Sequence, residues 1–454
     1  MGLYLFQALI DSDHLRAALI TPNATSVLEV IARGLKDTNA DVRVRALSCA
    51  NTFIVRSHPD DPIVPLYTQL LPSIIETISF CIEEGDDRVT VGFELLSTLA
   101  DDFMGHIQHL LPDLLRFALT VGVRSSLDMS LRQHALFFIE FTISNKPKSF
   151  LANVSLPEVI QLCFVLMTEH DEEEEESAAK YGSQIIDVIA LQIPAKYAWK
   201  PIMDRVAAGI TSASALDRRA ALSALAVISE GYADPVADAI EQIIPWVIAG
   251  LTDESLVRQA ALIAVSELAK NLCDIIAPYH QEIIPLLLSA TADKEDLVCI
   301  KSFYALSHYI GIEPSVVMPH LEAILSQLMP GLNHPNAEVK ELAINAISAC
   351  VSMAGNMFEP YFERVITIMK QWMSVTDPNL YIIRGRSMEC IAALATSTTH
   401  EIFMPHFEEV VTVALNGLET VDSPELREFI YRFFDQMARV YAEPMSPIYP
   451  VRTF

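Results

Sequence analysis

The stretch Thr252-Asp253-Glu254-Ser255-Leu256-Val257-Arg258-Gln259-Ala260-Ala261 carries the pattern that decides the fold. A polar turn precedes a segment that opens with an aliphatic residue, a basic residue, two variable positions and a small residue. An Asp or Asn in such a turn can cap the exposed amides of the next helix. The small residue lets that helix pack closely on a neighbouring one. The stretch therefore predicts the start of the second helix of a helical hairpin.

The same five-residue motif recurs along the chain, and its second residue serves as the marker of each repeat. The clearest copies are Val42-Arg43-Val44-Arg45-Ala46, Leu131-Arg132-Gln133-His134-Ala135, Val339-Lys340-Glu341-Leu342-Ala343, Ile383-Arg384-Gly385-Arg386-Ser387 and the variant Asp217-Arg218-Arg219-Ala220-Ala221. The markers fall at 43, 88, 132, 180, 218, 258, 299, 340, 384 and 427. Their intervals run from 38 residues (180 to 218) to 48 (132 to 180), the period of HEAT or armadillo hairpins.

Prolines distinguish these two kinds of hairpin. Pro72, Pro112, Pro245 and Pro285 each follow two aliphatic residues in the expected first helices. A proline inside a helix removes a hydrogen bond and kinks the helix, as in HEAT hairpins, whereas armadillo units split the first helix in two. The sequence therefore predicts an all-α, right-handed superhelix of about ten HEAT repeats. We expect the arginines at the marker positions to pair with acidic residues in the turns of adjacent repeats. Such pairs would form a structural ladder along the stack.

The composition agrees with one long hydrophobic core that continues along the repeats. Hydrophobic residues make up 51% of the chain and the mean hydropathy is +0.32, yet no run approaches the ~18–20 apolar residues of a membrane helix. Stacked repeats bury apolar residues in a continuous core. The chain has 15 glycines and no glycine-rich phosphate loop.

No chemistry-bearing cluster indicates an enzyme, a cofactor or a metal. His106 and His109 stand three residues apart, with Asp113 one helical turn further on and no third His or Cys at a suitable spacing, and two imidazoles alone rarely hold a metal. The seven cysteines are far apart and have no metal-site spacing. They predict reduced core thiols in a cytosolic or nuclear protein.

The acidic charge has two interpretations: a preference for basic partners, or the acidity that is common in soluble cytosolic proteins. Lys and Arg number 31 against 58 Asp and Glu, for a net charge of −27. A field of this sign repels nucleic acid and anionic membranes and speeds encounter with basic proteins.

One interval is irregular, and it defines the expected organisation of the chain. The longest interval contains the acidic run Asp171, Glu172, Glu173, Glu174, Glu175 and Glu176. Such a run is either a solvated surface loop without a specific role or a docking strip for a basic partner. HEAT repeats are expected over 21–170 and 177–442. Residues 1–20 resemble the tail of a preceding repeat, and 443–454 form an irregular tail. Neither end shows the polar capping repeat that normally closes a solenoid, so we expect a fragment of a longer superhelix.

The central repeats resemble the importin β (karyopherin β) family. The residues that carry this likeness are Ile228-Ser229-Glu230-Gly231, Ile243-Ile244-Pro245, Gly250-Leu251-Thr252-Asp253 and Val257 to Leu262. The acidic run followed by Gln184-Ile185-Ile186-Asp187 and Lys200-Pro201-Ile202-Met203 is similar to the subgroup that imports histones and ribosomal proteins. The family's usual Gly-Gln pair is replaced here by Ser266-Glu267.

The resemblance implies a nuclear import receptor that works in the cytoplasm, the nucleus and the nuclear pore. Its implied partners are basic cargo proteins such as histones and ribosomal proteins, Ran with bound GTP, and phenylalanine-glycine nucleoporins. It implies that the acidic run contacts Ran or cargo. The inner acidic set, which we define as the acidic cargo candidates on second helices, comprises Glu94, Glu140, Asp187, Glu230 and Glu267. The alternative is another HEAT scaffold, associated with a phosphatase or with tubulin; the mostly acidic or neutral turns count against tubulin.

Overall fold

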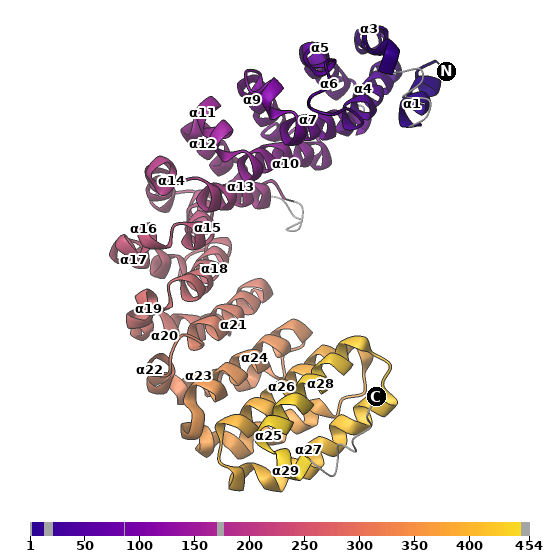
Figure 1. Ribbon diagram of the computed structural model, residues 1–454. Helices are drawn as coiled ribbons and strands as arrows, with labels where there is room; N and C mark the ends of the chain where they lie inside the picture. The colour runs from indigo at the N-terminus through magenta and orange to yellow at the C-terminus, as the bar shows by residue number, and fades with distance from the viewer. Residues whose placement is uncertain (1, 13–20, 86, 170–176, 446–454) are drawn as a thin grey trace. The chain divides into compact units, whose positions relative to one another are not determined.

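The computed structural model describes residues 2–12, 21–85, 87–169 and 177–445. These residues form helices and turns without a strand (Figure 1). They divide into two compact units, Met1–Tyr232 and Ala233–Phe454. Within the described ranges no single helix is long and apolar enough to cross a membrane. The pair Pro147–Asn153 and Leu156–Met167, bent by 101°, passes the same test of length and composition.

The first unit is a row of helical hairpins. Its first helices are α3 (Ala24–Leu35), α6 (Leu71–Glu83), α9 (Leu111–Gly122), α12 (Leu156–Met167) and α14 (Ala195–Ile210). Its second helices are α4 (Ala40–Val55), α7 (Thr90–Asp102), α10 (Met129–Asn145), α13 (Ala178–Gln192) and α15 (Ala215–Gly231). The other elements are α1 (Gly2–Asp11), η2 (Thr21–Asn23), α5 (Val64–Tyr67), η3 (Thr68–Leu70), η4 (Asp87–Val89), α8 (Met104–Ile107) and α11 (Pro147–Asn153). Each second helix packs on the next one along the chain, and α1 packs on α4.

The second unit repeats this plan. Its first helices are α17 (Ile240–Gly250), α20 (His280–Ala290), α23 (Leu321–Gly331), α25 (Phe362–Met373) and α27 (His400–Thr420). Its second helices are α18 (Ser255–Asn271), α21 (Asp296–Ile310), α24 (Ala337–Ala354), α26 (Tyr381–Ser397) and α28 (Pro424–Val440). The other elements are α16 (Ala233–Asp238), α19 (Cys273–Ile276), η5 (Ala277–Tyr279), α22 (Pro314–Val317), η6 (Met318–His320), η7 (Gly355–Tyr361), η8 (Pro378–Leu380) and α29 (Ala442–Met445). The described residues thus contain ten second helices, and the predicted stack of about ten HEAT-type hairpins is confirmed.

The small residue of the five-residue motif has the packing role that the sequence predicted. In three hairpins it lies against a glycine of the first helix. A Cβ added to Gly34 would lie 2.8 Å from the Ala46 Cβ, and one added to Gly209 would lie 2.9 Å from the Ala221 Cβ. Gly331 and Ala343 repeat this arrangement at 3.0 Å. Small side chains on both helices therefore let the two backbones of a hairpin approach closely.

Turn residues cap several second helices as expected. The side chain of Asn39 accepts a hydrogen bond from the Val42 amide at 3.3 Å. Asn336 caps α24 in the same way, through the Glu338 amide at 2.8 Å. In the stretch 252–261, however, the Asp253 side chain accepts a hydrogen bond from the adjacent Glu254 amide. Glu254 occupies the N-cap position of α18 without a side-chain cap bond.

The predicted position of the proline inside the first helix is confirmed in only two of four helices. Pro245 lies inside α17 and Pro285 inside α20. Pro72 and Pro112 instead lie in the first turns of α6 and α9. Short helices precede both prolines, so the chain has already turned before it reaches them. In a first turn the missing amide hydrogen costs no helical bond.

The arginine ladder is only partial. The Arg258 guanidinium lies 2.8 Å from the Asp293 carboxylate, in the turn of the next hairpin. Other marker arginines donate to carbonyl oxygens of their own turn, as Arg43 does to Asp37 and Arg218 to Ser212. These contacts tie turns to helices, so the arginines that make them serve the structure.

The thiols are free, and six of the seven are buried. Burial raises the pKa of Cys163 to about 12 and that of Cys49 to about 11. Cys273, at the start of α19, is exposed. The prediction of core thiols is therefore wrong for that one residue.

Candidate functional site

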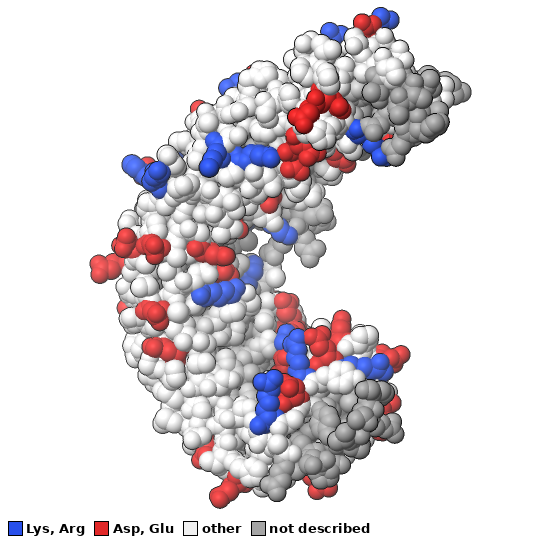
Figure 2. Space-filling view, viewed as in Figure 1, with Lys and Arg blue, Asp and Glu red and all other residues white. Residues whose placement is uncertain are grey.

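The inner acidic set lies on second helices, as the sequence predicted. In the first unit Glu94 belongs to α7, Glu140 to α10, Asp187 to α13 and Glu230 to α15. Because these helices pack side by side in chain order, their carboxylates lie on one row of neighbouring elements. On the face drawn in Figure 2, charged side chains form small separate groups among uncharged residues. The set therefore supplies one carboxylate on each of these four second helices.

The members of the set differ in how available their carboxylates are. Glu94 and Glu230 are exposed, and neither carboxylate has a hydrogen-bond or ion-pair partner among the described residues. Glu140 is half-buried, and burial raises the pKa of its carboxyl group. An exposed carboxylate can pair with an incoming cation without first losing a partner. Glu94 and Glu230 are therefore the freest carboxylates of the set.

Glu267 in the second unit has a different environment. Its carboxylate accepts a hydrogen bond from the Lys270 ammonium at 2.8 Å. The same ammonium donates to the Tyr304 hydroxyl at 2.7 Å, and the ring of Tyr304 lies edge-on to His308 at 4.5 Å between centroids. A nearby lysine neutralises Glu267, which makes it a weaker candidate for a cationic partner than the sequence alone suggested.

The acidic run from Asp171 to Glu176 lies outside the described residues. The residues that flank this run form hydrogen bonds with neighbouring helices. Glu169 accepts two hydrogen bonds from the buried Arg132 guanidinium, at 2.9 and 2.7 Å. The Arg219 guanidinium donates to the carbonyl oxygens of Met167 and Glu169. On the other side of the run, Ser177 caps α13.

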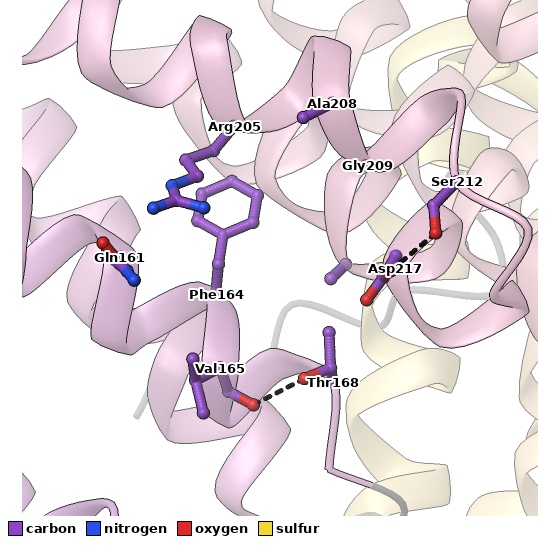
Figure 3. Close-up of a pocket in the computed structure, with 10 residues that line it drawn as sticks. Gln161, Phe164, Val165, Thr168, Arg205, Ala208, Gly209, Ser212 and Asp217 are labelled. Carbon is purple, nitrogen blue, oxygen red and sulfur yellow. Dashed lines mark hydrogen bonds between the residues drawn. The ribbon is translucent and has the colours of Figure 1, made fainter.

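A groove that sequence reasoning missed runs between the first helices α12 and α14. One part is a cavity of about 360 Å³ (Figure 3), and an adjoining part has a volume of about 580 Å³. The two parts share Gln161, Arg205 and Ala208. The other lining residues of this α12–α14 groove are Pro157, Glu158, Phe164, Val165, Thr168, Lys200, Pro201, Asp204, Gly209, Ser212, Asp217 and Ala220.

The α12–α14 groove offers an apolar floor between polar rims. Val165 is 46% exposed, which is high for a valine in a hairpin stack, and Phe164 lies beside it in the sequence. Lys200 pairs with Asp204 at 2.7 Å at one rim, and Ser212 donates to Asp217 at the other (Figure 3). An apolar side chain of a partner could fill this floor. The exposure of Val165 is a property of the fold, so the sequence alone held no signal for the groove.

Two family models match the chain. One, described as IPO5-like, TPR repeats, matches residues 18–117. The other, described as importin subunit beta-1-like, TPR repeats, matches residues 220–383.

Curated relatives match over nearly the whole chain. A probable importin subunit beta-4 of Schizosaccharomyces pombe is 25% identical and covers 84% of the chain, which spans 36% of that protein. Importin-4 of Homo sapiens is 25% identical over 98% of the chain and 43% of its own length. A probable importin-5 homolog of Dictyostelium discoideum is 27% identical with the same two coverages. The chain thus spans about two fifths of the length of the curated relatives it matches.

Solved structures of Kap121p share the fold. The structure of Kap121p alone superimposes with a TM-score of 0.84 at 20% identity, over 98% of this chain and 44% of Kap121p. Kap121p bound to Nup53p gives the same TM-score at 21% identity and the same coverages. The hairpin stack described above, the two importin family models and the importin relatives along its length together liken the chain to the importin-β family.

Proposed function

We propose that this chain is the cargo-holding part of a nuclear import receptor that moves between cytoplasm and nucleus. Its role is binding, without catalysis. The observation that carries the proposal is the row of second helices in the first unit, on which Glu94 and Glu230 present exposed carboxylates that pair with no other described residue. A basic protein lying along these helices would meet these charges in succession.

The overall charge and the structural relatives support this proposal. At −27 the chain attracts basic proteins over a long range. Kap121p, which shares the fold, was crystallised bound to Pho4p and to Ste12p. Histones and ribosomal proteins are basic, so their tails are the cargo class that we propose. The acidic run from Asp171 to Glu176 remains a proposed contact for cargo or for Ran with bound GTP.

Charge reversal on the second helices should weaken binding of a histone-tail peptide. We expect Glu94→Lys and Glu230→Lys each to raise the Kd about 3- to 10-fold, because each replaces an attraction by a repulsion. Fluorescence anisotropy with a labelled peptide at low and moderate salt measures this. The difference should shrink as salt rises, since exposed charges are screened.

The matched control reverses an exposed acid on a first helix of the same unit, Glu76→Lys in α6. It should leave the Kd nearly unchanged. Replacing residues 171–176 by neutral residues in a separate variant tests the acidic run. Equal affinity for the wild type and both second-helix variants would remove the second helices from the proposal.

The α12–α14 groove is our proposed site for nucleoporin phenylalanines. An aromatic side chain on the floor formed by Phe164 and Val165 would bury apolar surface while the peptide backbone meets the polar rims. Nup53p is the partner in one of the similar Kap121p structures, which supports a nucleoporin as a ligand.

Placing a charge on the groove floor should weaken nucleoporin binding. Val165→Asp should raise the Kd for a phenylalanine-glycine repeat peptide at least about 10-fold, because burying one aromatic side chain contributes about 1.5–3 kcal/mol. Val440→Asp is the matched control, since Val440 on α28 is 44% exposed against 46% for Val165. Isothermal titration calorimetry measures both. Equal losses in the two variants would contradict the assignment of the groove.

A pull-down distinguishes the receptor from other HEAT scaffolds. Capture of Ran with bound GTP and of phenylalanine-glycine repeats is the result expected for a receptor. Capture of tubulin or of phosphatase subunits in their place would favour the alternative scaffold.

A further inference from the structure

An aromatic pair lies on α10, with one ring exposed and the other half-buried. Phe137 is 52% exposed although it belongs to a helix that packs against α7, α9 and α13. The rings of Phe137 and Phe141 lie one helical turn apart, with centroids 6.2 Å apart and planes inclined at 36°. Residues four apart share one face of a helix. The two rings therefore form a small aromatic platform, in which the Phe137 ring is exposed and the Phe141 ring is half-buried.

Glu140 lies on the same side of α10, three residues after Phe137. Its side chain is half-buried, and it has no hydrogen-bond or ion-pair partner among the described residues. Burial raises the pKa of its carboxyl group, because a carboxylate that loses water without gaining a cation is destabilised. A ligand that supplied a cation here would relieve that cost.

The neighbouring second helices add negative charge and little positive charge. Helix α7 contains Glu94, Asp101 and Asp102 and has no lysine or arginine, and Asp187 lies on α13. The only lysine or arginine within α10 is Arg132, which is buried and paired with Glu169. The only one within α13 is Lys180. The surroundings of the aromatic platform therefore complement a cation.

We propose that Phe137, Phe141 and Glu140 form a receptor for an arginine side chain of a basic protein ligand. The guanidinium plane would stack on the aromatic pair while its N–H groups donate to the Glu140 carboxylate. This inference rests on the proposed function, because it names one contact that basic cargo makes on the second helices.

Arginine fits this site better than other cations or an apolar side chain. Its guanidinium is planar and weakly hydrated, so it stacks on aromatic faces and still forms directed hydrogen bonds. A lysine ammonium is a strongly hydrated point charge, and an apolar side chain would leave Glu140 unpaired. The site therefore selects arginine over lysine at one position of the ligand.

A thermodynamic cycle between protein and peptide tests the site. The probe is a short lysine-rich peptide with one central arginine, together with the same peptide carrying citrulline, a neutral isostere, at that position. Binding of both to the full chain is measured by fluorescence anisotropy for the wild type, Phe137→Ala and Glu140→Gln. Tyr431→Ala, at a 61% exposed aromatic on α28, and Glu408→Gln, at an exposed acid on α27, are the controls.

For the arginine peptide, we expect Phe137→Ala and Glu140→Gln each to raise the Kd about 3- to 10-fold. For the citrulline peptide the same variants should change the Kd less than about twofold, because the interaction they remove is already absent. The controls should not discriminate between the peptides.

Two results would overturn the inference, and they are distinguishable. If the arginine and citrulline peptides lose equal affinity, or none, in these variants while Glu94→Lys and Glu230→Lys still weaken binding, the arginine receptor is wrong and the proposed function stands. If neither peptide binds the wild-type chain, the proposed function fails together with this inference.

Discussion

Replacing Arg132 by alanine is expected to destabilise the first unit by about 3 kcal/mol, because breaking a buried ion pair leaves a charge without its partner. The Arg132 side chain is 5% exposed and forms two hydrogen bonds with the Glu169 carboxylate. Its Nε also donates to the Gly122 carbonyl oxygen at 2.8 Å. The substitution would leave the Glu169 carboxylate and the Gly122 carbonyl oxygen without these hydrogen-bond donors. Urea unfolding followed by circular dichroism measures the loss.

A surface ion pair of the same unit provides the control. Arg116 lies 3.0 Å from Asp113, and both side chains are largely exposed. Arg116→Ala should change the stability by at most about 0.5 kcal/mol. Arg132→Lys should fall between the two, because lysine keeps the charge and loses the forked geometry. Similar losses for Arg132→Ala and Arg116→Ala would contradict the importance of the buried pair.

Adding a single methyl group at Gly231 is expected to destabilise the same unit by about 2–3 kcal/mol. In Gly231→Ala the new Cβ would lie 2.4 Å from the carbonyl carbon and oxygen of Ala190 and 2.8 Å from the amide nitrogen of Leu191. These are backbone atoms, which cannot rotate away as a side chain can. Tyr232 further restricts any shift, because its hydroxyl donates to the carbonyl oxygens of Ile189 and Ile193.

Gly105→Ala is the control for this experiment. No heavy atom would lie within 4 Å of a Cβ at Gly105, which is in the short helix α8. Alanine is the better helix former, so this variant should be neutral or stabilised by up to about 1 kcal/mol. Thermal unfolding of both variants, together with hydrogen exchange at the C-terminal ends of α13 and α15, measures the effects. A Gly231→Ala protein as stable as the wild type would show that α13 and α15 separate without cost.

The sequence by itself predicted the repeat, because the signals for a hairpin are local. Markers such as Arg43 and Arg258 recur with a period that one hairpin requires. Ala46 meets its partner, Gly34, only 12 positions away in the chain. The second-helix positions of Glu94 and Glu230 follow from the same period. For residues at such positions, the distance in sequence from the repeat marker is enough to predict which helix of the hairpin they occupy.

The availability of each side chain, however, was decided by tertiary structure. Lys270 forms its bond to Glu267 within one turn of helix, but the bond to Tyr304 that helps to hold it there joins neighbouring hairpins. The Arg132–Glu169 pair joins residues 37 positions apart. The α12–α14 groove is likewise formed by two hairpins.

The exposure of Phe137 beside Glu140, which has no partner within the part of the chain that the structure describes, has the same origin. On an amphipathic helix the sequence places both residues near the core boundary, and an aromatic residue there is normally buried. Whether a ring is covered depends on how closely the neighbouring helices approach, and close packing between repeats sets that distance. The chain therefore encodes its architecture in a local repeat, while the binding surfaces that we propose lie where successive repeats leave side chains uncovered.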